Sequence, residues 1–397
     1  MADSRLPLWV VVGDIHLHAG SEACVAEDLA RLVRDVTAES PDAWVVMNGD
    51  VFDLDRVRGE PQGGVGADRA ASRLARILET HATVVDGLAS HVSRGGTVVF
   101  VAGNHDAELL LAPVRDVLLR AIGSSDRVHV VDRWVVGDRV VEHGHQADPD
   151  SAFYPDPATA LAKSRLSAFP LASLITRALL SHIPRFALAG HNHSPPLTVL
   201  LRVLRDYRLG AIPMILRFPI AGTQLVGCAA LAWLRGDAPR GSEASMGSPW
   251  RVARRLYLDR YMAAAIGLLT LLALAFGLAP PWLGWPVGLV AVALAIPPSR
   301  RKQFAHRDVR MCAGLALQHT AHGARIVVLG HTHRAFIDEL EGGAVHANHG
   351  AFSSCQGQPR TCERSYLRIS PTGSVSLHSM TPETRSDRAG SPRPSTD

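Results

Sequence analysis

Aspartate, asparagine and histidine residues gather in five short motifs, each of which contains glycine. The motifs are GDIHLH at 13–18, NGDVFD at 48–53, GNHD at 103–106, EHGHQ at 142–146 and GHTH at 330–333. Carboxylate, amide oxygen and imidazole without thiolate are ligands that suit Mn, Fe, Zn, Ni or Mg. The candidate ligands outnumber what one ion needs, so the sequence predicts two divalent ions bridged by a carboxylate.

Each motif follows a short apolar run that is typical of a buried strand. The runs lie at 8–12, 43–47, 97–102, 139–142 and 325–329. Stretches with helical spacing, at about 21–38 and 67–93, separate the first three runs and predict an α/β fold. Because parallel strands bring their carboxyl ends to one edge of a sheet, the motifs are expected to converge there. The strand texture of 128–145 returns at 325–378, which indicates one sheet system interrupted by an insertion.

The composition excludes several classes of protein. The chain has 397 residues, of which 47% are hydrophobic and 20% are charged, and this balance excludes a mainly disordered chain. The net charge of +4 rests on arginine rather than on a basic cluster, so we expect no nucleic-acid partner. The five cysteines are scattered and form no CxxC, which argues against a disulfide framework or a structural zinc site and favours a reducing compartment.

The insertion spans roughly 150–322 and contains a long uncharged segment. Residues 261–299 are 39 consecutive residues without Asp, Glu, Lys or Arg, with Pro280 and Pro281 near the middle. A membrane span needs about 20 apolar residues, so this segment predicts a transmembrane hairpin, with a buried helix pair as the alternative. Basic residues flank both ends and predict that both face the cytoplasm. They are Arg251, Arg254, Arg255, Arg260, Arg300, Arg301 and Lys302.

Residues 218–234 are a further apolar stretch of the insertion. Pro219, Gly222 and Gln224 weaken it as a membrane span. An odd number of spans would also place the two strand-rich stretches on opposite sides of the membrane. We therefore expect no third crossing. The first part of the insertion mixes apolar and basic residues, as interfacial helices do.

Taken in order, DxH, GD, GNHD, a single histidine in HG, and GHxH resemble the motifs of the calcineurin-like metallophosphoesterase superfamily. The resemblance covers about 8–145 and 323–378. It implies a four-layer α-β-β-α sandwich whose two ions clamp a phosphoryl group while water attacks it directly. In DIHLH, GDVFDLD and EHGHQADPD the texture is most similar to the branch that includes the UDP-2,3-diacylglucosamine pyrophosphatases, which act on a lipid-bearing nucleotide diphosphate at the membrane. That branch commonly has GNRD where this chain has GNHD.

The resemblance also implies a role for each residue of the site. One ion would be held by Asp14, His16 and His333, the other by Asn104, His143 and His331, with Asp50 bridging them and His105 as the general acid or the stabiliser of the leaving-group oxygen. Manganese is the ion that we expect first. His145, Asp53 and Asp106 are further candidates, for positioning the ligands or contacting the substrate. A second GHxH, at 190–193, lacks a preceding β-branched run and is expected to lie in a loop.

The expected organisation is a metallophosphoesterase domain in two parts, 1–149 and 323–379, a largely helical, membrane-associated insertion at 150–322, and a disordered tail at 380–397. The expected activity is hydrolysis of a phosphoester or pyrophosphate bond, in an amphipathic, lipid-linked or nucleotide diphosphate substrate, at the cytoplasmic face of the cell membrane. Two alternatives remain: a phosphodiesterase or phosphatase for soluble nucleotides, and a membrane scaffold that binds metal without catalysis. The sequence does not indicate the oligomeric state.

Overall fold

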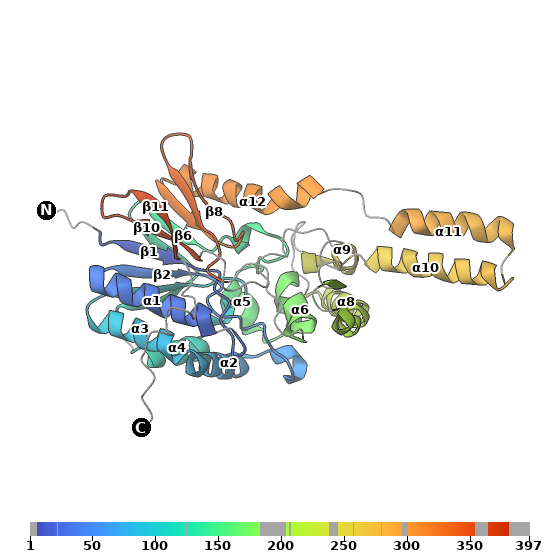
Figure 1. The fold of residues 1–397 in the computed structure, drawn as a ribbon, viewed down its shortest axis with the longest axis horizontal. Helices are drawn as coiled ribbons and strands as arrows, with labels where there is room; N and C mark the ends of the chain where they lie inside the picture. The colour runs from blue at the N-terminus through green and yellow to red at the C-terminus, as the bar shows by residue number, and fades with distance from the viewer. Residues whose placement is uncertain are drawn as a thin grey trace, which may run out of the picture.

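The computed structural model describes residues 6–21, 23–123, 126–182, 204–205, 208–237, 245–256, 258–278, 280–295, 301–353 and 364–380. Two β-sheets lie at its centre, with helices outside them and a helical arm that projects to one side (Figure 1). The second GHxH at 190–193 and residues 381–397 of the expected tail lie outside the described residues.

The first sheet has six strands in the order β11-β10-β1-β2-β3-β4. They are β1 (Trp9–Val12), β2 (Trp44–Asn48), β3 (Thr97–Val101), β4 (Val128–Val131), β10 (Arg364–Ile369) and β11 (Val375–Met380). Strands β1 to β4 are parallel, and β10 joins β1 antiparallel. The valines of β1 alternate between two cores: Val10 and Val12 face the helices, and Val11 faces the second sheet. This alternation follows from the two-residue period of a strand.

Helices cover the outer face of the first sheet (Figure 1). They are α1 (Ala23–Glu39), α2 (Ala67–Thr80), α3 (Ala82–Ser93) and α4 (Ala112–Ile122). Leu29 and Val33 of α1 and Leu118 of α4 belong to the same buried cluster as Phe100 of β3. Burial of such side chains contributes about 1.5–3 kcal/mol each and holds the strand ends in place.

The second sheet joins the chain on both sides of the insertion. Its order is β5-β6-β7-β9-β8, with β5 (Arg133–Val136), β6 (Arg139–Glu142), β7 (Ile326–Leu329), β8 (Ala335–Glu339) and β9 (Val345–His349). Strand β6 pairs in parallel with β7, so the single interrupted sheet system predicted from the sequence is confirmed. Helix α12 (Arg301–Ala321) covers the outer face, where Cys312 and Ala316 pack against Val327. The layers therefore run helix, sheet, sheet, helix, in a mixed α/β fold.

The remaining helices form a second body beside the sandwich. They are α5 (Pro157–Ala162), α6 (Leu171–Ala178), α8 (Ala211–Leu234), α9 (Pro249–Arg255), α10 (Leu258–Ala275) and α11 (Pro281–Ala295), with short 3-10 helices at Pro61–Gly64, Ala107–Leu110, His145–Ala147, Leu166–Ala168, Leu180–His182, Arg208–Gly210 and Ser245–Gly247. Leu174 of α6, Leu225 of α8 and Val252 of α9 share one buried cluster. Helices α10 and α11 lie side by side and form the projecting arm (Figure 1).

Helix α8 differs from the sequence-based expectation. It is 24 residues long and has Pro219 in its interior. The proline removes one backbone donor, but packing of one helix face keeps the neighbouring residues helical. Among the described residues, Arg208–Leu234 is the one helix long and apolar enough to cross a membrane, judged by length and composition alone. By that measure, and contrary to expectation, Pro219, Gly222 and Gln224 do not disqualify it as a span. Helix α10 contributes a shorter apolar segment, Ala265–Ala275.

Candidate metal centre

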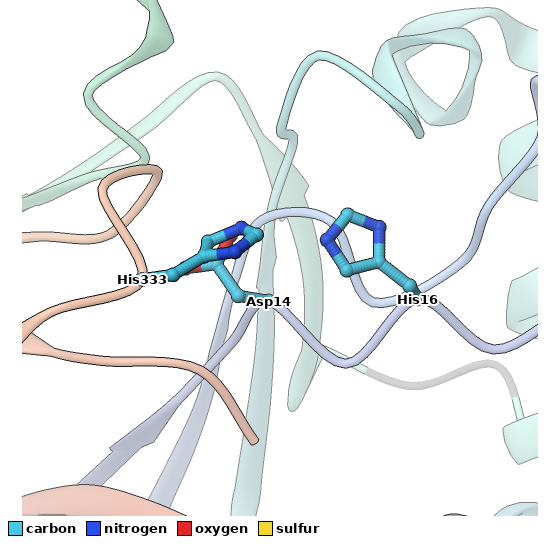
Figure 2. Close-up of side chains that lie close together, drawn as sticks. All are labelled: Asp14, His16 and His333. Carbon is cyan, nitrogen blue, oxygen red and sulfur yellow. The ribbon is translucent and has the colours of Figure 1, made fainter. Parts of the chain in front are cut away.

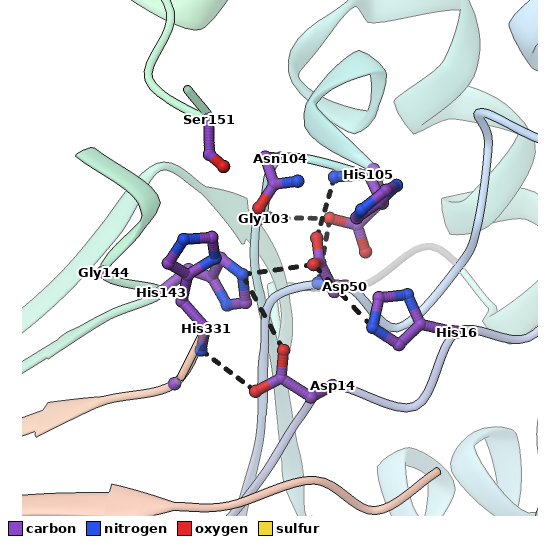
Figure 3. Close-up of polar contacts among 12 residues, drawn as sticks. Asp14, His16, Asp50, Gly103, Asn104, His105, His143, Gly144, Ser151 and His331 are labelled. Carbon is purple, nitrogen blue, oxygen red and sulfur yellow. Dashed lines mark hydrogen bonds and ion pairs between the residues drawn. The ribbon is translucent and has the colours of Figure 1, made fainter. Parts of the chain in front are cut away.

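The five sequence motifs meet at one end of the two sheets. Asp14 and His16 follow β1, Asp50 follows β2, Asn104 and His105 follow β3, His143 follows β6, and His331 and His333 follow β7. Each of these strands has a parallel neighbour in its sheet, so their carboxyl ends point the same way. The side chains converge between the sheets (Figure 3), which confirms the predicted convergence of the motifs.

Much of the site has an uncommon backbone conformation. Positive φ angles between 50° and 66° occur at Asp14, His16, Asp50, His331 and His333. A left-handed conformation in a residue other than glycine costs about 1–3 kcal/mol and persists only where neighbouring structure imposes it. Here the backbone N–H of Asp14 donates to the carbonyl of Gly49 at 3.0 Å, and that of His16 to the carbonyl of Asp50 at 2.8 Å. These hydrogen bonds hold the loop after β1 against the loop after β2.

Two glycines permit the close approach of the loops. A Cβ atom on Gly103 would overlap the carboxylate and backbone of Asp50, and one on Gly49 would overlap the ring of His143. Gly49 also has a φ of 76°, which a residue with a side chain rarely adopts. The glycines of GD and GNHD are therefore needed for packing between the candidate ligands.

The first group of candidate ligands is Asp14, His16 and His333 (Figure 2), whose ligand atoms lie within 4.8 Å of one another. Nε2 of His333 lies 3.1 Å from Oδ1 of Asp14. All three side chains are nearly buried. This is the trio that the resemblance to metallophosphoesterases assigns to one ion.

A second group lies next to the first and shares Asp14 with it. Its members are Asp14, Asp50 and His143. Nε2 of His143 lies 3.3 Å from Oδ2 of Asp50 and 3.9 Å from Oδ1 of Asp14. The same Asp50 oxygen is 4.0 Å from Nε2 of His16. Asp50 thus belongs to the second group and also lies next to His16 of the first, where a bridging carboxylate would lie.

Asn104 and His331 border the second group (Figure 3). The Asn104 side chain is buried, and its Oδ1 atom accepts no hydrogen bond in the described structure. The His331 ring lies 5.5 Å from the His143 ring, centroid to centroid, and its backbone N–H donates to Oδ2 of Asp14 at 3.0 Å. Its Nε2 atom lies 3.4 Å from Oδ2 of Asp148, a residue to which the sequence analysis gave no role.

The unsatisfied atoms at this centre fit a metal. Buried polar atoms without a hydrogen-bond partner in the described structure include both ring nitrogens of His16 and Oδ1 of Asn104. Such atoms are rare in proteins and each costs about 1–3 kcal/mol. Oδ1 of Asp14 and Nε2 of His143 make ion-pair contacts, with His333 at 3.1 Å and with Asp50 at 3.3 Å. Together these atoms are carboxylate, amide and imidazole donors, the set that divalent ions such as Mn²⁺ or Zn²⁺ accept. The residues present therefore suit the two divalent ions expected from the sequence.

The electrostatics keep the carboxylates ionised. Burial alone would raise the pKa of Asp14, but His333 and His143 lower it below its usual range. Burial likewise opposes ionisation of Asp50, whose pKa is nevertheless lowered by His143 and His105. Burial lowers the pKa of His16 to about 4, so its imidazole is neutral near pH 7 and has a lone pair to donate. Burial opposes a charge on His143, but Asp50 and Asp14 raise the pKa of His143 to about 9, so a divalent ion bound there would take the place of this proton.

Asp106 positions the ligand-bearing loops. Its carboxylate accepts hydrogen bonds from the backbone N–H groups of Gly103 at 2.7 Å, Val51 at 2.8 Å, and Asp50 and Phe52 at 3.2 Å. Burial and the nearby Asp50 raise the pKa of Asp106 to about 7. This carboxylate therefore ties the loop after β2 to the loop after β3.

The other two additional candidates have different surroundings. Oδ1 of Asp53 lies 3.6 Å from Nδ1 of His105, and its Oδ2 accepts a hydrogen bond from Nε of Arg56 at 2.9 Å. His145 is fully buried with its ring 5.5 Å from that of His143, and neither of its ring nitrogens has a hydrogen-bond partner in the described structure. Asp53 therefore lies next to His105, the predicted acid, whereas His145 lies next to His143, a predicted ligand.

Besides Asp148, two further residues of the site were missed in the sequence. His349, at the end of β9, is fully buried, and its Nε2 lies 3.9 Å from Oδ2 of Asp14. Burial lowers its pKa to about 4. Asp55 lies closer to His105 than Asp53 does, with 3.0 Å between its Oδ2 and Nδ1 of His105. The NHG at 348–350, at the end of a predicted strand, could have revealed His349, because β9 is a further parallel strand of the second sheet.

The fold and the site together form a mixed α/β sandwich with grouped carboxylates and imidazoles at its strand ends. The model of the calcineurin-like phosphoesterase family matches residues 9–212, which is half of the chain, and the protein belongs to this family. The match reaches into the helical insertion, and β7 and β9 lie beyond it.

Three solved structures that match this chain are only weakly similar to it. A dimetal phosphatase from Danio rerio has 11% sequence identity and a TM-score of 0.35, with 92% of each chain covered. A cold-active protein-tyrosine phosphatase of a psychrophilic Shewanella species has 12% identity and a TM-score of 0.25, covering 94% of this chain and 80% of that one. A point mutant of a cold-active protein tyrosine phosphatase has 11% identity and a TM-score of 0.26, with the same coverage. No curated protein sequence matches this chain. The comparisons do not assign it to the branch of the UDP-2,3-diacylglucosamine pyrophosphatases.

Proposed function

We propose that this protein is a two-metal hydrolase of phosphoester or pyrophosphate bonds, acting on an amphipathic phosphorylated substrate at the membrane. The observation that carries the hydrolase proposal is the convergence of Asp14, His16, Asp50, His143 and His333 in two adjoining groups with unsatisfied ligand atoms. In a calcineurin-like phosphoesterase, this donor set supports phosphoryl chemistry over a purely structural site.

The residues divide the work of such a reaction. Asp14, His16 and His333 would hold one ion and Asn104, His143 and His331 the other, with Asp50 between them. Bound divalent ions would neutralise the phosphoryl oxygens and lower the pKa of the attacking water. His105 lies within 4.8 Å of the ligand atoms of His16 and Asp50, close enough to donate a proton to a leaving oxygen next to the ions.

The exposed apolar surface of the insertion supports the membrane part of the proposal. Large exposed hydrophobic residues are Leu216, Ile220 and Trp233 on α8, Leu268, Leu269 and Phe276 on or after α10, and Trp282, Trp285 and Leu289 on α11. A surface this apolar is unusual for a protein that meets only water. Arg254 and Arg255 lie at the end of α9, just before the arm, where anionic lipid headgroups would attract them.

The arrangement of the helices favours insertion of the arm with α8 at the membrane surface. Helices α10 and α11 run across the view in Figure 1, whereas α8 is seen nearly end-on at their base. One face of α8 is buried, with Ala221, Leu225 and Ala229, and the opposite face carries Leu216 and Ile220. We therefore propose that α8 lies in the interface and that the catalytic sandwich faces the cytoplasm.

Helix α6 brings the insertion to the metal centre. The hydroxyl of Ser173 donates to the backbone carbonyl of Asn104 at 3.2 Å, and Ser173 is fully buried. An apolar helical body thus borders the loop of a predicted ligand. This position supports a substrate whose phosphate enters the centre while its apolar part stays with the insertion.

The test is a hydrolysis panel with detergent-purified protein loaded with Mn²⁺. The substrates are p-nitrophenyl phosphate, bis-p-nitrophenyl phosphate, a soluble UDP-sugar and a diacylated UDP-sugar. We expect the acylated compound to be preferred. In the Asp50→Asn variant we expect all rates to fall by about 100-fold or more, since residues that merely orient metal ligands are worth about 10–100-fold.

Metal content and melting temperature give a second readout. We expect about two ions per wild-type chain by elemental analysis, fewer in Asp50→Asn, and a chelator-induced fall in melting temperature in the wild type only. Preference for soluble esters would overturn the amphipathic substrate and leave the hydrolase. Metal binding without turnover of any phosphate ester would overturn the hydrolase in favour of a metal-binding scaffold.

A further inference from the structure

A buried chain of charged groups connects the predicted acid, His105, to the helical insertion. Asp55 stands in the middle of this chain. Its Oδ2 lies 3.0 Å from Nδ1 of His105, and its Oδ1 accepts a hydrogen bond from Nε of Arg177 at 2.6 Å. Arg177 belongs to α6 and is 122 residues further along the chain than Asp55. All three side chains are buried.

Arg177 is held on every side. Its Nη2 donates to Oε1 of Glu108 at 2.6 Å, and its Nη1 donates to the carbonyl of Gly63 at 3.1 Å. The guanidinium carbon lies 3.8 Å from the centroid of the Phe169 ring. The planar, fixed geometry of a guanidinium is well suited to holding a carboxylate in one orientation. Arg177 therefore presents Asp55 to His105 in a defined position.

Asp53 is the less favourable of the two carboxylates facing His105. Its Oδ1 is 3.6 Å from Nδ1 of His105, beyond a hydrogen bond, and its Oδ2 is occupied by Arg56, three residues away. Asp55, at 3.0 Å, is the closer partner. Arg177, which orients Asp55, comes from the insertion, whereas Arg56, which binds Asp53, comes from the same loop as Asp53.

Building on the proposed hydrolase function, we propose that Arg177 of the insertion positions His105 through Asp55, so that the insertion completes the catalytic centre. Nδ1–H of His105 would donate a hydrogen bond to Oδ2 of Asp55, which lies 3.0 Å away, and Nε2–H is then the donor to the substrate. When the P–O bond breaks, its electron pair stays on the leaving oxygen, which takes the Nε2 proton. His105 is left neutral, and water restores its proton.

The packing of α6 explains why the insertion is needed for this role. Leu174 of α6 is fully buried with Leu225 of α8 in one cluster, and Ser173 donates to the backbone of Asn104, next to His105. Loss of this packing would move Arg177 away from Asp55. Asp55 and Arg177 are positioning residues, because both act on the substrate only through His105.

The test compares leaving groups. A good leaving group such as p-nitrophenolate needs little help from an acid, whereas an alkoxide needs a proton. For Asp55→Asn and Arg177→Gln we expect kcat for an alkyl phosphate ester to fall at least about tenfold more than kcat for the p-nitrophenyl ester. This is less than the roughly 100- to 10,000-fold that general acid catalysis contributes, because these variants misplace the acid without removing it. Metal content per chain is expected to stay at the wild-type value. Arg177→Lys restores the charge without the planar fork and should recover only part of the rate.

Arg73→Gln is the matched control. Arg73 pairs with Glu60 and Glu108 in the same buried network, and its ion pairs in the described part of the chain do not include Asp55 or His105. We expect this variant to lower the melting temperature as Arg177→Gln does, while the ratio of the two rates stays at the wild-type value. A double-mutant cycle combines Asp55→Asn with His105→Ala. In the His105→Ala background, Asp55→Asn should not lower kcat for the alkyl ester any further.

The outcomes separate the two proposals. Equal losses on both esters, or full additivity with His105→Ala, would overturn the positioning role of Asp55 and Arg177 while the hydrolase function stands. Wild-type protein that binds metal and hydrolyses neither ester would overturn the hydrolase function itself and the positioning role with it. If Arg73→Gln also changed the ratio of the alkyl-ester rate to the p-nitrophenyl-ester rate, the effect of Arg177 would be that of the whole buried network on structure, and the positioning role would be overturned.

Discussion

Asp14, His16, Asp50, His331 and His333 combine a left-handed backbone with a functional side chain. Each conformation is unfavourable by itself, and together they direct five side chains from three loops toward one small volume. Folding supplies the energy for this strain through the strand cores and through hydrogen bonds to buried carboxylates. Asp106 is the residue on which these loops depend most, because it binds the backbone on both sides of Asp50.

Asp106→Ala should therefore be strongly destabilising. It removes the acceptor of four backbone N–H groups in a buried place, and we expect the free energy of unfolding to fall by about 3 kcal/mol or more. Urea unfolding followed by circular dichroism measures the change. Asp116→Ala, at an exposed position of α4, is the control and should change stability by no more than about 0.5 kcal/mol. Equal effects of the two variants would contradict the role of Asp106.

At the scale of elements, helix α8 does two jobs with two faces. Its inner face, with Leu225 and Ala229, packs against α6 and so supports the side of the metal centre. Its outer face carries Leu216 and Ile220, which are 63% and 59% exposed. A helix that is apolar on both faces is explained by a protein core on one side and lipid on the other.

Charging the outer face of α8 tests this explanation. The double variant Leu216→Glu and Ile220→Glu should bind anionic vesicles at least about tenfold more weakly, equivalent to about 1.4 kcal/mol, which is less than the burial of two such side chains contributes. Vesicle flotation measures binding, and hydrolysis of p-nitrophenyl phosphate in detergent should be unaffected. Val135→Glu with Leu377→Glu, on exposed positions of the sandwich, adds the same charge and should leave vesicle binding intact.

At the scale of the whole molecule, the sandwich and the arm are separate in their packing. The strand cores that hold the metal centre draw on β1 to β4, β6, β7, β9 and β10, whereas α10 and α11 pack mainly against each other (Figure 1). Helix α6 contacts the sandwich through Ser173 and Arg177, and α8 packs against α6. The arm is thus expected to set location, and the rest of the insertion to take part in the chemistry.

Replacement of residues 262–292 by a short Gly-Ser linker tests this division. Helices α10 and α11 run side by side as a hairpin, so a short linker can join the ends nearest the sandwich (Figure 1). We expect the shortened protein to keep its metal content and its rate on p-nitrophenyl phosphate, because no residue of the centre is removed. In fractionated cells, alkaline carbonate should release it from membranes that retain the full chain. Loss of metal binding in a folded, shortened protein would show that the arm belongs to the catalytic core.

The order and type of the residues were sufficient to predict the strands, the meeting of the five motifs and the family. A β-branched run followed by glycine and a ligand residue can be recognised within a few residues of sequence. Parallel strands then bring the ends of such runs together at one edge of the sheet. The roles of individual ligands stay predictions that the geometry supports. The interruption of one sheet by a long insertion was also predictable, since similar strand texture stands on both sides of it.

Only the tertiary structure decided the rest. Arg177 reaches Asp55 across 122 residues of chain, and nothing in its immediate neighbours indicates that partner. Asp55 lies close to Asp50 in the sequence, but only the structure shows that it is nearer to His105 than Asp53 is. The continuity of α8 through Pro219 depends on packing against α6 and α9 rather than on helix propensity. Burial is a property of the assembled molecule, and it leaves ligand atoms without hydrogen-bond partners. Tertiary packing also decides that Asp55 is closer to His105 than Asp53 is.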